Sequence, residues 1–162
     1  MATKLTKEQA AALLAAYQKQ QTDATNASIA AYNKTVDADL NKTEAAIAEE
    51  QREAQSTADA AYDRATVTAL IERRKIAETL SNLGLSRSGT ADSANESIER
   101  KRTVSERSAR EKKQQVLSTL SQRLIAAREQ AAAKKAEHTA SANKTLKAKI
   151  AEKKLTLDKA AL

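Results

Sequence analysis

The segment Leu80-Ser81-Asn82-Leu83-Gly84-Leu85-Ser86-Arg87-Ser88-Gly89 decides the fold, because it holds both glycines of a 162-residue chain that contains no proline. In a helix interior, glycine costs about 1 kcal/mol and proline about 3 kcal/mol relative to alanine. Because both residues are missing everywhere else, we expect two uninterrupted helices joined by one short turn. Gly84 fits the left-handed position that ends a helix, and Leu80 and Leu85 fit the hydrophobic contact of a Schellman ending.

The turn divides the chain into three predicted parts. Residues 1–82 form a long helix, residues 83–92 form the turn, and residues 93–162 form a second long helix. At about 1.5 Å per residue, each helix would be on the order of 100 Å long. The predicted fold class is therefore all-α, a coiled-coil-like helical hairpin. The alternative is an open turn, which would give one bent rod.

Capping signals mark where both helices can begin. Thr6 and Gln9 have the spacing of a capping box, in which each side chain accepts a hydrogen bond from the other residue's backbone N–H. Ser93 and Glu96 have the same spacing after the turn. The residues that can cap the second helix are Thr90, Asp92 and Ser93.

Large apolar side chains are scarce. The chain has fifteen leucines, seven isoleucines and four valines, no phenylalanine and no tryptophan, but thirty-six alanines. Alanine has the highest helix propensity and buries little surface. The sequence therefore favours long helices over a globular core, and we expect the apolar stripes to be completed by further copies of the chain or by other proteins. Because there is no cysteine, disulfides and thiolate metal sites are excluded.

Apolar residues of the first helix recur at eleven-residue steps, which predicts a seam with about 3.67 residues per turn. Three rows form this seam: Val36, Ile47, Ala58, Ala69 and Leu80; Tyr32, Thr43, Ala54, Ala65 and Ile76; and Ile29, Leu40, Gln51 and Tyr62. In the second helix the spacing is heptad-like and fades near His138. The residues of this second seam are Leu117, Leu120, Leu124, Ala127 and Ala131.

Charge is distributed unevenly between the two predicted helices. Residues 1–82 carry ten Lys and Arg against twelve Asp and Glu, whereas residues 83–162 carry eighteen against nine. One interpretation is a solvated basic helix that pairs with its mildly acidic neighbour. The other is non-specific contact with nucleic-acid phosphates. The candidate DNA-facing residues are Arg100, Lys101, Arg102, Arg107, Arg110, Lys112 and Lys113.

Two other kinds of surface contact are poorly supported. All three tyrosines lie in the acidic half, so stacking of nucleic-acid bases on aromatic side chains of the basic helix is not indicated. A basic helix on an anionic membrane would need bulky apolar residues, and the second half contains neither tryptophan nor phenylalanine. Membrane contact is therefore not expected.

No residue pattern indicates catalysis, cofactor binding or metal binding. His138 is the only histidine, and without cysteine it does not build a convincing triad or zinc site. Glu49, Glu50 and Glu53 cluster around Arg52, which favours an ion-paired, solvated face. The glycine-containing turn lacks the lysine of a phosphate-binding loop. We therefore expect a protein that is not an enzyme and that has no cofactor, no metal and no small-molecule substrate.

Residues 80–89 are followed by Thr90-Ala91-Asp92-Ser93 and preceded by Tyr62-Asp63-Arg64. This arrangement resembles one in small Ala/Lys/Gln-rich helical virion proteins of tailed bacteriophages, where long helices flank a Leu-x-x-x-Gly-Leu-Ser-x-Ser-Gly turn. The specific part of the resemblance is confined to the turn region, and the rest is similarity of composition. The resemblance implies a structural role at the portal or connector, inside the head, or among the ejected components.

Together these features predict a non-enzymatic structural or assembly protein of a bacteriophage particle. We expect homo-oligomers that contact portal or capsid proteins, with the basic helix able to face DNA. The alternatives are a sequence-independent nucleic-acid-binding helical protein and a generic coiled-coil scaffold or adaptor. The N-terminus shows no apolar signal segment, and no run approaches the roughly 20 apolar residues of a membrane span. The expected location is the virion, after synthesis in the host cytoplasm.

Overall fold

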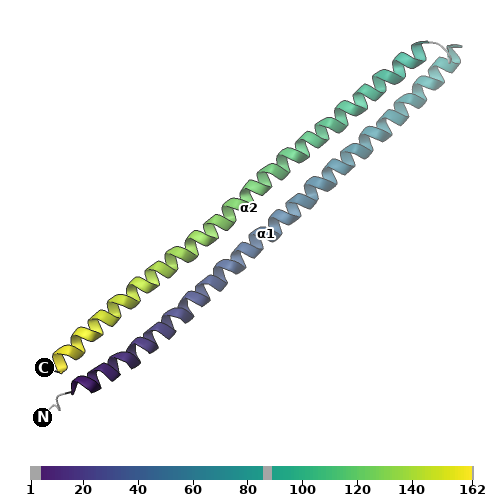
Figure 1. Ribbon diagram of the computed structural model, residues 1–162. Helices are drawn as coiled ribbons and strands as arrows, with labels where there is room; N and C mark the ends of the chain where they lie inside the picture. The colour runs from purple at the N-terminus through teal and green to yellow at the C-terminus, as the bar shows by residue number, and fades with distance from the viewer. Residues whose placement is uncertain (1–4, 86–88, 162) are drawn as a thin grey trace. The chain divides into compact units, whose positions relative to one another are not determined.

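The fold is a helical hairpin, as the position of the two glycines predicts (Figure 1). The computed structural model describes residues 5–85 and 89–161. Nearly all of these residues lie in two helices, α1 (Lys7–Asn82) and α2 (Gly89–Ala160), and none lies in a strand. The helices are therefore joined by a short connection, and they pack against each other in antiparallel directions.

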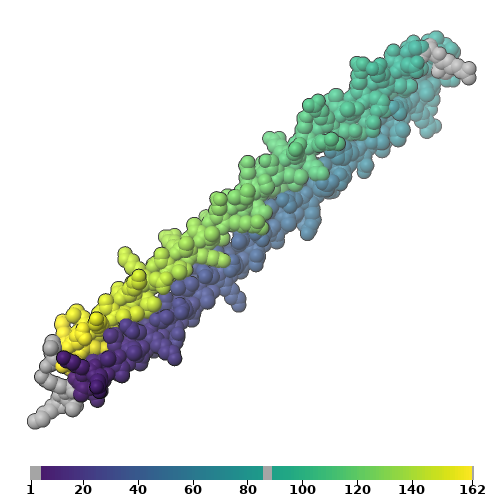
Figure 2. Space-filling model, viewed as in Figure 1, coloured from purple at the N-terminus to yellow at the C-terminus, as the bar shows by residue number. Residues whose placement is uncertain are grey.

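The hairpin divides into two compact units. The turn unit is Glu44–Leu124, and the terminal unit consists of Met1–Thr43 and Ile125–Leu162. Each unit contains one segment of α1 and one segment of α2. The space-filling view shows the side chains of the two segments in contact within each unit (Figure 2).

Helix α1 begins at the predicted capping box. The backbone N–H of Thr6 donates to Oε1 of Gln9 over 3.0 Å, and the backbone N–H of Gln9 donates to Oγ1 of Thr6 over 3.2 Å. Two backbone donors that the helix itself leaves unpaired are thereby satisfied by side chains. The first helical residue is Lys7.

Helix α1 ends in a Schellman motif at the predicted glycine. Gly84 has a φ of 70°, in the left-handed region. The N–H of Leu85 donates to the carbonyl of Leu80 over 2.8 Å, and the N–H of Gly84 donates to the carbonyl of Ser81 over 3.1 Å. These two bonds are the pair that defines the motif and satisfy two of the last free carbonyls of α1.

Helix α2 begins earlier than expected, at Gly89. Ser93 and Glu96 therefore lie inside the helix, and the prediction that Ser93 caps it is wrong. Asp92 lies in the first turn of α2, where its negative charge favours the positive end of the helix dipole. The rest of the predicted turn, residues 86–88, lies outside the described residues.

The buried face of α1 follows the predicted eleven-residue spacing. Every member of the first row is buried, with at most 9% of its surface exposed: Val36, Ile47, Ala58, Ala69 and Leu80. The members of the second and third rows are half-buried, except Thr43, which is exposed. The predicted seam residues Tyr32, Leu40 and Tyr62 therefore lie at the flanks of the contact rather than at its centre.

The buried face of α2 follows an eleven-residue spacing over most of its length, of which the predicted heptad-like stretch is one part. The central row is buried or half-buried throughout: Ile98, Ala109, Leu120, Ala131 and Ala142. Between Leu117 and Ala131 the predicted heptad residues do face α1, with Leu120 buried and Leu124 half-buried. Both helices of the turn unit therefore contact each other through the same repeat.

Candidate functional site: the groove and charged faces of the turn unit

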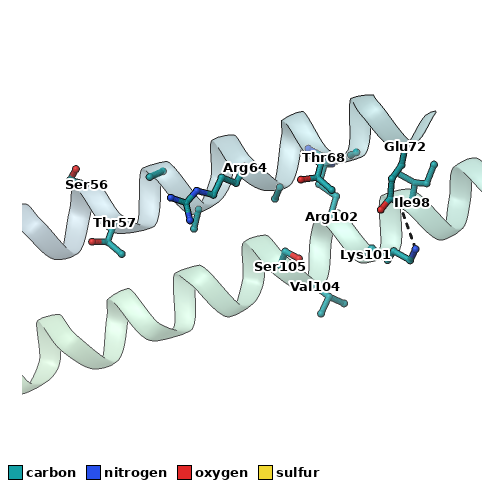
Figure 3. A pocket seen from close by; sticks show the side chains of 14 residues that line it. Ser56, Thr57, Arg64, Thr68, Glu72, Ile98, Lys101, Arg102, Val104 and Ser105 are labelled. Carbon is teal, nitrogen blue, oxygen red and sulfur yellow. Dashed lines mark ion pairs between the residues drawn. The ribbon is translucent and has the colours of Figure 1, made fainter. Parts of the chain in front are cut away.

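An open groove runs along one side of the turn unit, between α1 and α2. It consists of two adjoining hollows of about 850 and 780 Å³. Both hollows are lined by Thr57, Ala61, Val104 and Ser105, so they form one continuous surface. Figure 3 shows one of them, with lining side chains that come from both helices.

The groove exists because the residues along the seam are small here. On the α1 side it is lined by Ala54, Ala58, Ala61, Ala65 and Ala69, and on the α2 side by Ser105, Ser108 and Ala109. Such side chains support the helices without filling the space beside the seam. Sequence reasoning missed this groove. Its signal was the run of alanines in the α1 rows, opposite serines on α2.

The two walls of the groove carry opposite charge. The α1 wall has a net charge of −2, from Glu50, Glu53, Glu72 and Arg64. The α2 wall has a net charge of +4, from Lys101, Arg102, Lys112 and Lys113. An ion pair crosses each end of the groove, Lys101–Glu72 at 3.6 Å and Arg123–Glu50 at 2.6 Å.

Four of the seven candidate DNA-facing residues are engaged in ion pairs. Their contacts are Arg100–Glu96 at 2.6 Å, Lys101–Glu72 at 3.6 Å, Arg102–Glu99 at 2.9 Å and –Glu106 at 3.0 Å, and Arg107–Glu111 at 2.8 Å. The hydrogen bond to Glu99 and the charge of Glu106 raise the pKa of Arg102 above its ordinary value. These cations therefore serve the hairpin's own charge pairing.

The other three, Arg110, Lys112 and Lys113, have no ion-pair partner within residues 5–85 and 89–161. Arg110 and Lys112 are exposed, and Lys113 is half-buried. Their charges are available to a partner from outside the chain. The structure thus separates self-paired cations around residues 100–107 from three neighbouring cations at residues 110–113 that are not paired within the described chain.

Ion pairs also join the two helices. In the turn unit, Arg73 pairs with Glu99, in addition to the two pairs at the ends of the groove. In the terminal unit, Lys135 of α2 pairs with Asp37 of α1. The basic helix therefore pairs with its acidic neighbour, although exposed pairs of this kind contribute only about 0–1 kcal/mol each.

His138 lies in the seam of the terminal unit, stacked on Tyr32 with ring centroids 4.0 Å apart and planes 7° apart. Its Nδ1 atom is buried without a hydrogen-bond partner, as is Oδ1 of Asn33. Sequence reasoning placed Tyr32 in the seam but did not identify His138 as its partner. The pair forms an aromatic contact between the two helices of this unit.

Acidic residues and the histidine do not converge on a metal site in the described ranges: no three His, Cys, Asp or Glu side chains gather in a way that could hold an ion. In the described parts of both helices, no stretch is long and apolar enough to cross a membrane. Comparison of the chain with family models, curated proteins and solved structures finds no match.

Proposed function

We propose that this chain is a non-enzymatic structural component that assembles with further protein chains in a bacteriophage particle. The observation that carries the proposal is the small number of large apolar side chains in the core. Among the described residues, the core has ten buried hydrophobic residues, of which four are alanine. Burial contributes roughly 25 cal/mol per Å² of apolar surface, so alanine contacts stabilise a two-helix contact only weakly.

The hydrophobic residues that remain outside the core support assembly. Ten large hydrophobic side chains of the described chain are exposed, as many as the residues that are buried. Five of them lie on the helices of the turn unit: Val67, Leu70, Ile71, Val104 and Val116. Two of these five, Val104 and Val116, line one groove between α1 and α2, and a cluster of this kind is what a partner chain could cover.

The assignment to a bacteriophage particle is supported by the turn sequence. Residues 80–85 end α1 in a Schellman motif with Gly84 in the left-handed position, and this motif falls within the turn sequence that carries the resemblance. In a structural protein, this ending would let the chain reverse direction after a long helix.

Mass spectrometry of phage particles purified from the strain that carries this sequence tests the proposal. We expect peptides from both helices in gradient-purified particles, at many copies per particle and after nuclease and protease treatment of intact heads. A chain found only in the lysate, and absent from particles that contain their portal and capsid proteins, would contradict the proposal.

A second candidate function, sequence-independent binding of nucleic acid, is supported by the unpaired cations of α2. Besides Arg110, Lys112 and Lys113, several lysines near the end of α2 have no ion-pair partner among the described residues: Lys134, Lys144, Lys147, Lys149, Lys154 and Lys159. Each neutralised phosphate would add to a steep dependence of affinity on salt.

Fluorescence anisotropy with a labelled DNA duplex, measured across a salt series, tests this second function. Tight binding of the isolated chain that weakens steeply with salt, equally for unrelated sequences, would favour it over the structural role. Weak binding of the isolated chain at moderate salt would favour the structural role.

A further inference from the structure

We propose that the groove of the turn unit is a self-association surface, on which two copies of the chain pair groove to groove. In this pair both turns lie at the same end, and α1 of each chain lies along α2 of its partner. This inference gives the proposed function a specific contact surface. It rests on the proposed function in one respect only, namely that the chain assembles with other chains.

The shape of the groove fits a second pair of helices. Its lining of alanine, serine and threonine lets helix backbones approach closely, and its combined hollows run from Glu50 to Glu72 on α1. A pair of hairpins joined on this face would form a four-helix bundle, in which a single seam becomes a closed core.

The rim of the groove supplies apolar surface for such a contact. Val104 is 67% exposed and Val116 is 42% exposed, and both line the groove from α2. Their burial would add to the alanine contacts of the seam at roughly 25 cal/mol per Å². The surface is therefore more apolar than a solvated helix face requires.

Charge identifies the partner as a second copy. Because the α1 wall is acidic and the α2 wall is basic, the surface is complementary to itself when α1 lies on the partner's α2. Glu53 and Lys112, one on each wall, have no ion-pair partner in the described chain. A negatively charged polymer would match the α2 wall alone, and a neutral helix would leave the charges of both walls unmatched.

The same charges fix the orientation. A two-fold axis parallel to the helices brings Glu72 of each chain over Lys101 of the other, which gives a square of alternating charges around the pair that Figure 3 shows. A two-fold axis perpendicular to the helices would place α2 on α2 and oppose two basic walls. The geometry therefore favours turns at the same end.

Light scattering after gel filtration tests the surface, with a matched pair of variants. We expect a dimer, or a larger oligomer built from it, for the wild type. Val104→Asp places a charge in the groove and should weaken association about tenfold or more. Val67→Asp is the control. Val67 also lies in a helix, α1, and is 53% exposed, but it does not line the groove.

Circular dichroism of both variants checks that they remain helical. A monomeric wild type, or an oligomer that Val104→Asp leaves as stable as Val67→Asp does, would overturn the inference. Neither result would bear on whether the chain occurs in phage particles, so this failure is distinguishable from failure of the proposed function.

Charge reversal in two separate chains tests the orientation. With Glu72→Lys alone, or Lys101→Glu alone, all four charges at positions 72 and 101 of the two chains have the same sign. Each variant should therefore be monomeric under conditions in which the wild type associates. An equimolar mixture should regain the oligomer, because unlike charges then meet between the chains. A mixture that stays monomeric, or single variants that associate as the wild type does, would overturn the proposed pairing.

Discussion

Gly84 shows how one residue can determine the connectivity of the fold. Its φ of 70° is the only positive value among the described residues. A Cβ added there would meet no atom within 4 Å, so a substitution costs energy through backbone conformation alone. Gly89 also has open space around it, but it lies in α2 and its φ is outside the left-handed region. Replacing each glycine by alanine should therefore change the free energy of unfolding in opposite directions.

Gly84→Ala should lower the free energy of unfolding by about 1–2 kcal/mol, which is the cost of placing an L-residue in the left-handed region. Gly89→Ala should leave it unchanged or raise it by about 0.5–1 kcal/mol, because alanine loses less conformational entropy in a helix. Urea denaturation followed by circular dichroism measures both. Equal effects of the two substitutions would contradict this account.

His138 carries the second prediction at this scale. Its ring stacks on Tyr32, but its buried Nδ1 has no partner, and an unsatisfied buried polar atom costs about 1–3 kcal/mol. His138→Phe keeps an aromatic ring in the stack and removes the unpaired nitrogen, so the melting temperature should rise. His138→Ala loses the stack as well and should lower it. A fall on both substitutions would show that Nδ1 is satisfied in solution.

At the scale of the helices, the ends of α1 could be predicted because their signals are local. Thr6 with Gln9, and Gly84 with Leu85, each specify a hydrogen-bond pattern within a few residues. The start of α2 could not be located, because Thr90, Asp92 and Ser93 are all competent caps and the local signals therefore leave several starts open.

The spacing of α2 was missed because charged residues occupy seam positions. Arg102, Lys113 and Lys135 share one eleven-residue row and are half-buried, with their aliphatic stems available for packing while the charged groups remain near solvent. An apolar pattern search counts them as polar. The groove is harder still to predict, because it arises where small side chains leave space unfilled and not from any residue pattern that a search would detect.

Ile47 tests how much the eleven-residue seam contributes to the turn unit. It is 2% exposed at the centre of the seam, whereas Leu70 is 58% exposed on the same helix. Ile47→Ala should lower the free energy of unfolding by about 2–4 kcal/mol through lost burial and a cavity. Leu70→Ala should change it by less than about 0.5 kcal/mol. Similar losses at both positions would imply that Leu70 is buried in an assembly.

At the scale of the whole molecule, few large apolar side chains hold the two long helices together, since four of the ten buried hydrophobic residues in the described chain are alanine. Stability should therefore depend on association more than on the hairpin alone. Raising the protein concentration a hundredfold should raise the melting temperature of the wild type by mass action. Val104→Asp should melt at a lower temperature than the wild type at each concentration, because its association is weaker. A melting temperature that is independent of concentration for the wild type would contradict the assembly argument.

The eleven-residue repeat of both helices has a consequence for how such a protein changes length. Because each repeat returns the buried face to the same side, a gene duplication that adds one repeat to α1 and one to α2 would extend the hairpin by about 16 Å and leave every other contact in register. A gain or loss that is far from a whole number of helical turns would rotate the remaining residues off the seam. The length of the hairpin can thus change in evolution by whole repeats. Such changes would fit the protein to surroundings of different size while its helix–helix contacts stay the same.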